Sequence, residues 1–232
     1  MENPSYAKTD LPTLEPVSES FTIRLKNALD NEISFNGGYK NYCICIVDIV
    51  NSSKITAPLS KEKVCKYYSI FLNSMAIIAK EFGGKVVKNV GDSLLYYFPE
   101  TSDSSDKHGF VDPLECSMAM IEAHGVINQK MREEGLPPVN YRISADYGSV
   151  VTAKTITSAN EDVFGATVNM CAKINHSAIS NSMVIGGDLF EIVKSFDGYK
   201  FEPVAVYSSG FKFEYTVYSV TYHKVRRWVF SG

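Results

Sequence analysis

Two aspartates stand out because each lies at the end of, or in a turn between, strongly apolar segments. Asp48 is the second-last residue of the run YCICIVDI at residues 42–49, and Asp92 lies on a turn within KNVGDSLLYYF. A carboxylate beside a buried strand is costly unless it is hydrogen-bonded, paired or bound to a cation. Carboxylate oxygens suit Mg²⁺ or Mn²⁺, which often bridge to substrate phosphates. Asp48 alone also fits a strand-exit cap, and Asp92 alone an ordinary hairpin turn. Their order along the chain brings both to one sheet edge and predicts a two-metal site.

Two further segments have residues suited to a phosphorylated ligand. The small polar residues 51–53 follow Asp48, and their backbone amides could surround phosphate oxygens. In DVFGATVNMCAKI, residues 162–174, Asn169 and Lys173 are four residues apart, so a helix would place both on one face. That spacing is equally typical of a solvated polar helix face.

Periodicity and turn residues predict the elements that position these side chains. Apolar runs predict strands at 42–49, 85–90, 93–98, 141–146, 149–156, 183–185, 199–207 and 212–222. Helical spacing predicts helices at 18–31, from a cap at Ser60 to Gly83, at 112–134 and at 166–178, with a small one after Gly187. In this interpretation residues 141–156 turn around Gly148. The hairpins require antiparallel pairing, so the predicted fold class is α+β.

Composition indicates one ordinary globular domain. The 232 residues are 45% hydrophobic and 21% charged, and the net charge of -3 does not suggest a nucleic-acid-binding surface. Five cysteines are an odd, scattered set; the alternating Cys43 and Cys45 are predicted to be core residues on one side of a strand. Reduced thiols predict an intracellular, cytoplasmic protein.

The ends of the chain predict no targeting or membrane segment. Residues 1–17 lack a basic region followed by an apolar run, and no apolar stretch reaches the roughly 18 residues that a membrane span needs. We expect a partly disordered N-terminal arm with a short helix at 1–40, the main domain at 41–223 and a solvated tail at 224–232.

Taken together, the motifs resemble the catalytic domain of the class III adenylyl and guanylyl cyclases. VDIVNSS resembles the first metal motif of that family, and KNVGDSLLYYF its second metal hairpin. YRISADYGSV resembles a strand pair ending in Gly, and VFGATVNMCAK resembles the family's catalytic helix. The resemblance covers roughly residues 42–222, in the family's order. It implies a ferredoxin-like central antiparallel sheet flanked by helices.

The resemblance also implies a role for each matching position. Two Mg²⁺ or Mn²⁺ ions per site would be held by Asp48, Asp92 and the backbone carbonyl of Ile49. The triphosphate would be held by Val50, Asn51, Ser52 and Ser53. Lys88 and Asp162 occupy the base-reading positions, where adenylyl cyclases carry Lys with Asp or Thr and guanylyl cyclases usually carry Glu with Cys. Asn169 would orient the ribose.

Two positions depart from the family pattern. Lys173 stands where the family has its transition-state arginine, and a lysine lacks the planar bidentate fork of a guanidinium. The family also has a triphosphate-binding lysine in a Lys-Gly turn near the end of the domain. The best match here is Lys212, two residues after Gly210.

The expected activity is conversion of a nucleoside triphosphate, ATP by the base-reading pair, to its 3′,5′-cyclic monophosphate and pyrophosphate. The resemblance implies a head-to-tail homodimer, in which one chain supplies the metal aspartates and the other supplies the base-reading residues with Asn169 and Lys173. Two alternatives stay open. One is a pyrimidine (UTP or CTP) cyclase like those of bacterial antiphage systems, and the other is a catalytically silent nucleotide-binding module.

Overall fold

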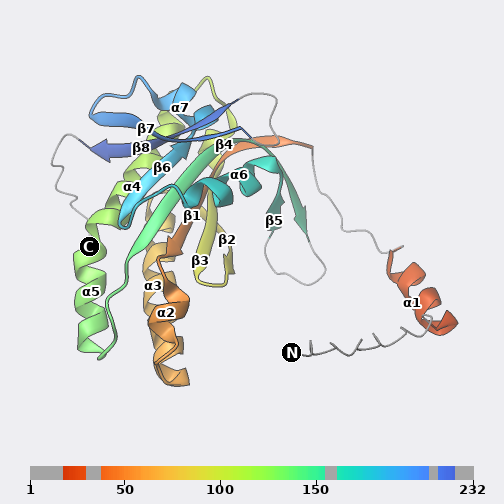
Figure 1. Cartoon of the computed structure of the whole chain (residues 1–232). Helices are drawn as coiled ribbons and strands as arrows, with labels where there is room; N and C mark the ends of the chain where they lie inside the picture. Colours follow the sequence, from red (N-terminus) through yellow and green to blue (C-terminus); the bar gives the residue numbers. More distant parts are fainter. Residues whose placement is uncertain (1–17, 30–37, 155–160, 209–213, 223–232) are drawn as a thin grey trace, which may run out of the picture. The chain divides into compact units, whose positions relative to one another are not determined.

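The computed structural model describes residues 18–29, 38–154, 161–208 and 214–222. The chain divides into two compact units, Met1–Ser34 and Phe35–Gly232. The described part of the first unit is the exposed helix α1, Glu19–Leu29, which confirms the helix expected there. The second unit contains the sheet and the helices packed on it (Figure 1).

The second unit is built on one mixed sheet with the strand order β2-β3-β1-β4-β6-β8-β7, to which β5 adds by pairing with β4. The strands are β1 Lys40–Ile49, β2 Lys85–Val90, β3 Ser93–Phe98, β4 Tyr141–Lys154, β5 Glu161–Phe164, β6 Ser182–Gly186, β7 Tyr199–Tyr207 and β8 Tyr215–Tyr222. Every pairing is antiparallel except that of β4 with β6. The α+β class is confirmed, with this one parallel pair inside an otherwise antiparallel sheet.

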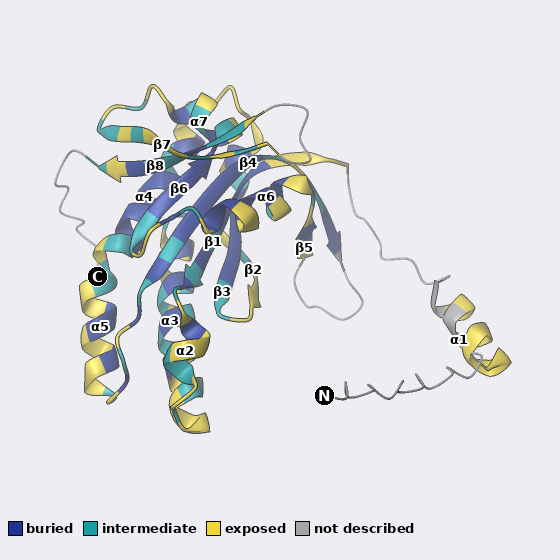
Figure 2. Ribbon diagram, in the orientation of Figure 1, coloured by how far each residue is buried: buried dark blue, intermediate teal, exposed yellow. Residues whose placement is uncertain are grey.

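Helices cover the two faces of the sheet unequally. One face packs against the helices α3 Lys61–Glu81, α4 Val111–Glu122, α5 His124–Glu133 and α7 Gly187–Val193. The other face carries α6, Ala166–Asn175, which contacts β1, β4 and β6. Short helical turns connect these elements: α2 Ser52–Thr56, η1 Pro99–Ser102 and η2 Lys107–Phe110. Figure 2 shows β1, β3, β4 and β6 largely buried between the two layers.

Successive side chains of β1 point alternately to the two faces of the sheet, so they pack against different layers of helices. Cys43 and Cys45 belong to the large core under α3 and α4, both fully buried with their sulfurs 4.0 Å apart. Ile44 and Ile46 belong to the smaller core beneath β5 and α6. The two cysteines are therefore core residues on one side of the strand, as expected. Asp48, two residues after Ile46, falls on the α6 side.

Several predicted boundaries are confirmed, and one helix is split. The strands at 85–90 and 93–98 have the expected bounds. Ser60 caps α3 by accepting a hydrogen bond from the backbone N–H of Lys63 at 3.4 Å. The single helix expected at 112–134 is wrong, because the chain breaks at Ala123 into α4 and α5.

The hairpin expected around Gly148 is also wrong. Residues 141–154 form one long strand, and β4 pairs with β5 beyond that point rather than folding back on itself. A Cβ on Gly148 would lie 2.6 Å from Oγ1 of Thr167 in α6. The glycine therefore permits a close approach of α6 to the sheet and does not make a turn.

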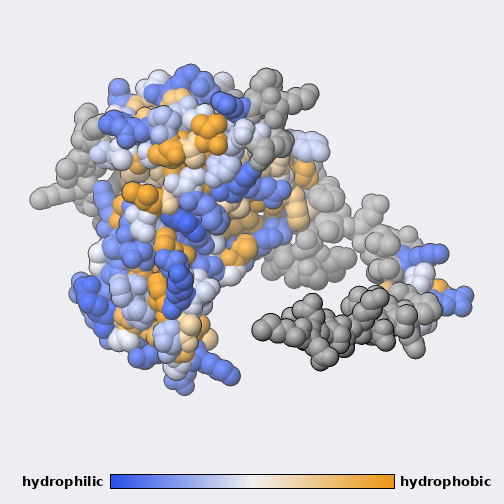
Figure 3. Space-filling model, viewed as in Figure 1, coloured by the Kyte–Doolittle hydropathy of each residue, from blue (hydrophilic) through white to orange (hydrophobic). Residues whose placement is uncertain are grey.

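The surface of the second unit mixes side-chain types. Hydrophilic and hydrophobic residues alternate over the face shown in Figure 3. Among the described residues, no helix combines the length and apolar character that would let it cross a bilayer.

Candidate active site

Asp48 lies between two polar partners that the sheet register supplies. In the pairing of β1 with its neighbours, Asp48 stands opposite Ser93 on β3 and opposite Arg142 on β4. Ser93 Oγ donates to Asp48 Oδ1 at 2.6 Å. Arg142 donates from Nε at 3.2 Å and from Nη2 at 3.0 Å to Oδ2. These partners fix the position of the Asp48 carboxylate at this strand end.

The β2–β3 turn places Asp92 at the same end of the sheet as Asp48. Val90 pairs with Ser93, so Gly91 and Asp92 form a two-residue turn, and Gly91 takes the positive φ of 62° that such a turn favours. Asp92 is adjacent in sequence to Ser93, the residue that pairs with Asp48. The structure therefore brings the two predicted metal aspartates to one sheet edge.

The predicted phosphate-binding segment forms a tight turn into α2. The N–H of Val50 donates to the carbonyl of Asn140 at 2.8 Å, so it is engaged within the protein. Asn51 adopts a left-handed conformation, with φ of 59°, and is the N-cap of α2. Ser52 and Ser53 open that helix, where backbone N–H groups lack intrahelical acceptors. Amides of residues 51–53 remain suited to phosphate oxygens, whereas that of Val50 does not.

The predicted base-reading residues meet directly. Lys88 Nζ on β2 donates to Asp162 Oδ2 on β5 at 2.5 Å. The side chain of Lys88 is 46% exposed and that of Asp162 is 16% exposed. The Lys88 ammonium also lies 6.0 Å from the centroid of the Phe164 ring. Two strands that are distant in sequence thus present a donor and an acceptor side by side.

A cavity of about 510 Å³ is lined by three of the predicted site residues, Asp48, Lys88 and Asn169. Residues of β1, β2 and β3 form one wall, and the segment from β5 into α6 forms the other. The lining residues are Ile46, Asp48, Lys88, Val90, Ser93, Leu95, Val163, Phe164, Gly165, Val168, Asn169, Ala172, Asn175 and His176. Its volume lies within the range of small-molecule sites.

Lys173 lies apart from that cavity, although Asn169 one turn earlier lines it. The Lys173 ammonium stacks over the ring of Tyr207 on β7, 4.8 Å from its centroid. Tyr207 Oη in turn lies 2.9 Å from Ser177 Oγ. The residue expected to act on the phosphates is thus held against β7. Lys212, the other predicted phosphate ligand, lies outside the described residues.

Sequence reasoning missed Arg142 as a site residue. The arginine was visible in the segment YRISADYGSV, but only the strand register shows that it faces Asp48. Asn175 was missed as well. Its Nδ2 donates to the Ile46 carbonyl at 3.3 Å and to Ser144 Oγ at 3.1 Å, which fastens the last turn of α6 to the sheet.

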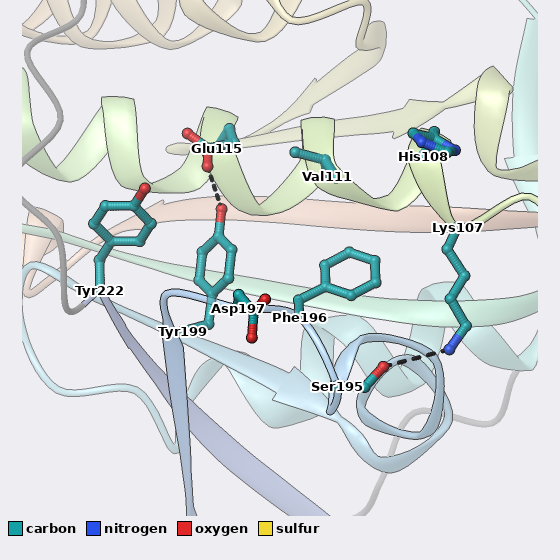
Figure 4. Close-up of a pocket in the computed structure, with 9 residues that line it drawn as sticks. All are labelled: Lys107, His108, Val111, Glu115, Ser195, Phe196, Asp197, Tyr199 and Tyr222. Atoms are coloured by element: carbon teal, nitrogen blue, oxygen red, sulfur yellow. Dashed lines mark hydrogen bonds between the residues drawn. The ribbon is translucent and has the colours of Figure 1, made fainter.

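A second cavity, of about 340 Å³, lies between α4 and the loop before β7 (Figure 4). The hydroxyl of Tyr199 donates to the buried carboxylate of Glu115 at 2.5 Å, and Lys107 Nζ lies 3.4 Å from Ser195 Oγ. Of the predicted catalytic, base-reading and metal residues, Asp48, Lys88 and Asn169 line the first cavity, and none lines this one.

Two proteins with similar sequences are named as nucleotide cyclases. A cytidylate cyclase from Staphylococcus aureus is 26% identical over 174 residues, covering 71% of this chain and 41% of that protein. An adenylate cyclase from Streptomyces coelicolor is 22% identical over 146 residues, covering 63% of this chain and 32% of that protein. The chain therefore spans less than half the length of either relative.

Solved structures share the fold. The adenylyl cyclase CyaB from P. aeruginosa superposes with a TM-score of 0.71 at 21% identity, covering 82% of this chain and 97% of that one. The guanylyl cyclase Cya2 gives a TM-score of 0.69 at 22% identity, covering 81% and 95%. At these identities the likeness establishes the architecture.

The family itself is established by a model built from many sequences. The model described as "Adenylate and Guanylate cyclase catalytic domain" matches residues 36–221. This match includes the strands, the hairpin turn and the helix that surround the first cavity. The chain belongs to the adenylate and guanylate cyclase catalytic domain family.

Proposed function

We propose that this domain converts a nucleoside triphosphate, with ATP as the first candidate, to the 3′,5′-cyclic monophosphate and pyrophosphate. The observation that carries the proposal is the contact of Lys88 with Asp162 beside a cavity that Asp48 and Asn169 also line. Each chain thus presents two sets of groups: the base-reading pair with Asn169 for a ribose, and separately the Asp48 carboxylate for phosphate-bound cations.

The base-reading pair favours adenine over guanine. An ammonium is a donor without acceptor capacity, and an ionised carboxylate is an acceptor only. Lys88 can donate to adenine N1, and Asp162 can accept from the N6 amino group. Guanine presents a ring N–H and a carbonyl at the equivalent edge, so the same pair would meet it with reversed polarity.

CTP is a second candidate with specific support. Cytosine carries an amino group beside an unprotonated ring nitrogen, so its N4 and N3 repeat the donor and acceptor order of adenine N6 and N1. The similarity to a protein named cytidylate cyclase favours this candidate. UTP fits less well, because uracil replaces the amino group with a carbonyl. Choice between adenine and cytosine then depends on base size rather than on hydrogen-bond polarity.

The donor set at the sheet edge suits hard divalent cations. Asp48 and Asp92 offer carboxylate oxygens, and the described residues contain no cluster of three or more His, Cys, Asp or Glu side chains that could form a complete metal cage. Mg²⁺ typically binds through one or two carboxylates plus substrate phosphates and water. Two ions held by Asp48, Asp92 and the Ile49 carbonyl would supply Lewis acidity at the phosphates and the 3′-hydroxyl.

The chain's own residues have positioning roles in the reaction. The 3′-hydroxyl gives its proton to water, its oxygen forms a bond to the α-phosphorus, and the bond from that phosphorus to the bridging oxygen breaks in line, releasing pyrophosphate. Asn169 would hold the ribose so that the 3′-oxygen is close and aligned. Residues 51–53 would hold phosphate oxygens through backbone amides. Arg142, already fixed beside Asp48, can turn its fork to a phosphate when a cation binds that carboxylate.

We further propose that two chains combine head to tail, each site taking Asp48 and Asp92 from one chain and the base-reading residues from the other. Val90 and Phe164 support a covered cavity, since both are large apolar residues that line it while 54% and 37% exposed. An Asp48→Ala protein mixed with an Asn169→Ala protein should then recover activity at one site in two. Mixed dimers without any recovery would contradict the shared site.

One experiment tests the activity and ranks its substrates. The purified protein is incubated with ATP, GTP, CTP and UTP, with Mg²⁺ and with Mn²⁺, and products are identified by mass. We expect cyclic AMP, with cyclic CMP as the other outcome that the base-reading pair allows. Metal-dependent binding of ATP without pyrophosphate release would instead support a silent nucleotide-binding module. An Asp48→Ala control should form no product.

A further inference from the structure

The start of β4 is held by Asn181, a residue to which neither the sequence motifs nor the family likeness gave a role. Asn181 immediately precedes β6 and adopts a left-handed conformation, with φ of 59°. Its backbone N–H donates to the Tyr141 carbonyl at 2.6 Å, and its Oδ1 accepts from the Tyr141 N–H at 3.3 Å. Its Nδ2 donates to Asn140 Oδ1 at 2.8 Å. One asparagine thus binds the backbone of Tyr141 and the side chain of Asn140.

Asn140 and Tyr141 lie against the end of β1 from which the predicted phosphate-binding turn begins. The carbonyl of Asn140 accepts from the Val50 N–H at 2.8 Å. Tyr141 stands opposite Ile49 in the pairing of β1 with β4. Ile49 and Val50 directly precede residues 51–53, so a shift of Asn140 or Tyr141 would move the turn with them.

Arg142, the residue after Tyr141, connects the same segment to Asp48. It stands opposite Asp48 in the strand register, and its guanidinium donates to Asp48 Oδ2 at 3.0 Å and 3.2 Å. The two side chains are only 20% and 17% exposed, so the backbones that carry them decide where the ion pair lies. Asn181 therefore acts on the predicted metal carboxylate and on the phosphate-binding turn of its own chain. Both belong to the same half of the proposed shared site.

Two residues of α5 hold the preceding part of the segment. Asn128, 5% exposed, donates from Nδ2 to the Val139 carbonyl at 2.9 Å and accepts from the Val139 N–H at 2.7 Å. His124 Nε2 lies 3.0 Å from Asn140 Oδ1. Side chains thus fix three consecutive residues, 139–141, before the strand reaches Arg142. Within this network, Asn181 contacts the two positions nearest to Arg142.

We infer that Asn181 is a positioning residue for the metal- and triphosphate-binding half of the site. It fixes Asn140 and Tyr141, and through them the turn at 51–53 and the Arg142–Asp48 pair. It lines neither of the two cavities and acts without touching the substrate. The inference rests on the proposed function, because it requires a triphosphate bound at this end of the sheet.

The variants separate the amide of Asn181 from its backbone conformation. Asn181→Gly removes the amide, and glycine adopts the left-handed conformation readily. Asn140→Ala removes the acceptor of the Asn181 Nδ2, whereas Asn140→Asp keeps an oxygen there. Asn73→Ala, at an exposed asparagine of α3, is the control.

The first test measures binding of analogues that cannot cyclise, with and without phosphates. Affinities for 3′-deoxy-ATP and 3′-deoxyadenosine, and for the matching cytidine pair, are measured with Mg²⁺ by calorimetry, together with melting temperatures. We expect Asn181→Gly and Asn140→Ala to weaken triphosphate binding about tenfold, since small displacements of positioning groups are costly. Nucleoside binding should stay unchanged, because the base-reading residues are not displaced. Asn140→Asp should keep most of the affinity, and Asn73→Ala should match the wild type.

Two results of this test would overturn the inference. One is triphosphate binding in Asn181→Gly that equals that of the wild type. The other is equal weakening of both ligands, which, with a lowered melting temperature, would give Asn181 a purely structural role.

The second test uses mixed dimers to assign Asn181 to one half of the site. Asn181→Gly mixed with Asn169→Ala should be more active than either protein alone, because one site then combines an intact metal half with an intact base half. Asn181→Gly mixed with Asp48→Ala should regain nothing, because both chains are impaired in the same half. Recovery with Asp48→Ala would contradict the positioning role.

Failure of the inference can be told from failure of the proposed function. A wild type that cyclises a nucleoside triphosphate while Asn181→Gly binds its analogue normally refutes the role of Asn181 alone. A wild type that cyclises none of the four substrates, but whose binding of 3′-deoxy-ATP depends on Asn181, refutes the activity and retains the positioning role.

Discussion

The ammonium of Lys173 lies 4.8 Å from the centroid of the Tyr207 ring. The Tyr207 hydroxyl lies 2.9 Å from Ser177 Oγ, just after the end of α6, and donates to the backbone carbonyl of Lys173 at 3.4 Å. Tyr207 therefore contacts both the side chain and the backbone of Lys173. A cation–π contact at an exposed site contributes about 0.5–1 kcal/mol. A contact of this strength favours the position of Lys173 against β7, and a stronger partner such as a phosphate could displace it.

Replacement of Tyr207 should change how often Lys173 reaches the substrate. In Tyr207→Leu the ring contact is lost, and we expect kcat to rise about two- to fivefold, the equivalent of the cation–π energy. Tyr207→Phe keeps the ring and serves as the matched control, with kcat within about twofold of the wild type. A fall in kcat for Tyr207→Leu with an unchanged melting temperature would show that the ring holds Lys173 in its active position.

A guanidinium at position 173 should improve catalysis. Lysine offers a point charge, whereas arginine has a planar fork that can contact two oxygens of the developing phosphate charge. We expect Lys173→Arg to raise kcat by about tenfold with little change in KM, and Lys173→Met to lower it by a similar or larger factor. Steady-state rates with saturating substrate measure both. Equal rates for all three proteins would remove Lys173 from the catalytic machinery.

Much of the architecture could be predicted because local signals were strong. The two strands around Gly91 have the expected bounds, since a valine-rich run and a Leu- and Tyr-rich run flank a turn residue with positive φ. The turn predicted at Gly148 was wrong because the local sequence does not show why the glycine is there. A glycine that admits a neighbouring helix and a glycine that makes a turn look alike in a sequence, and only the position of Thr167 separates them.

The site shows the same division between local and long-range information. The family motifs pointed to Lys88 and Asp162, and the structure places them in contact although 74 residues separate them. Arg142 has no local feature that marks it, because its role beside Asp48 depends on strand register. The side-chain direction of Lys173 depends on Tyr207, which is 34 residues away, so helical spacing could not reveal it.

Reversal of the charge at Lys88 should alter the choice of base. In Lys88→Glu the donor to the ring nitrogen becomes an acceptor, which suits the ring N–H of guanine and repels Asp162. We expect kcat/KM for ATP or CTP to fall at least about a hundredfold and the preference for GTP to rise. Lys88→Met, which removes the donor without adding an acceptor, controls for loss of the charge. A parallel loss for all four substrates would show that Lys88 has a structural role only.

The buried carboxyl of Asp146, which lies outside the first cavity, should make the free energy of unfolding depend on pH. Its carboxylate is 2% exposed and accepts hydrogen bonds from the Tyr215 hydroxyl at 2.7 Å and from the Tyr147 N–H at 2.9 Å. Burial raises the pKa of this carboxyl to about 7, although the hydrogen bond from Tyr215 opposes the rise. The folded protein therefore holds this proton more tightly than the unfolded chain, where the pKa is near 3.8.

The sign of the effect follows from that difference. The stability that the protonated Asp146 contributes is fully present below about pH 4 and is lost as the pH rises through about 7, a change on the order of 4 kcal/mol. Asp188, whose pKa burial also raises, acts in the same direction. Between pH 5 and 8, urea unfolding should show a steeper fall in the free energy of unfolding for the wild type than for Asp146→Asn, whose amide does not ionise. Asp197→Asn, at an exposed carboxylate, should follow the wild type. Parallel curves for the wild type and Asp146→Asn would mean that Asp146 is ionised across this range, with the hydrogen bond from Tyr215 outweighing burial.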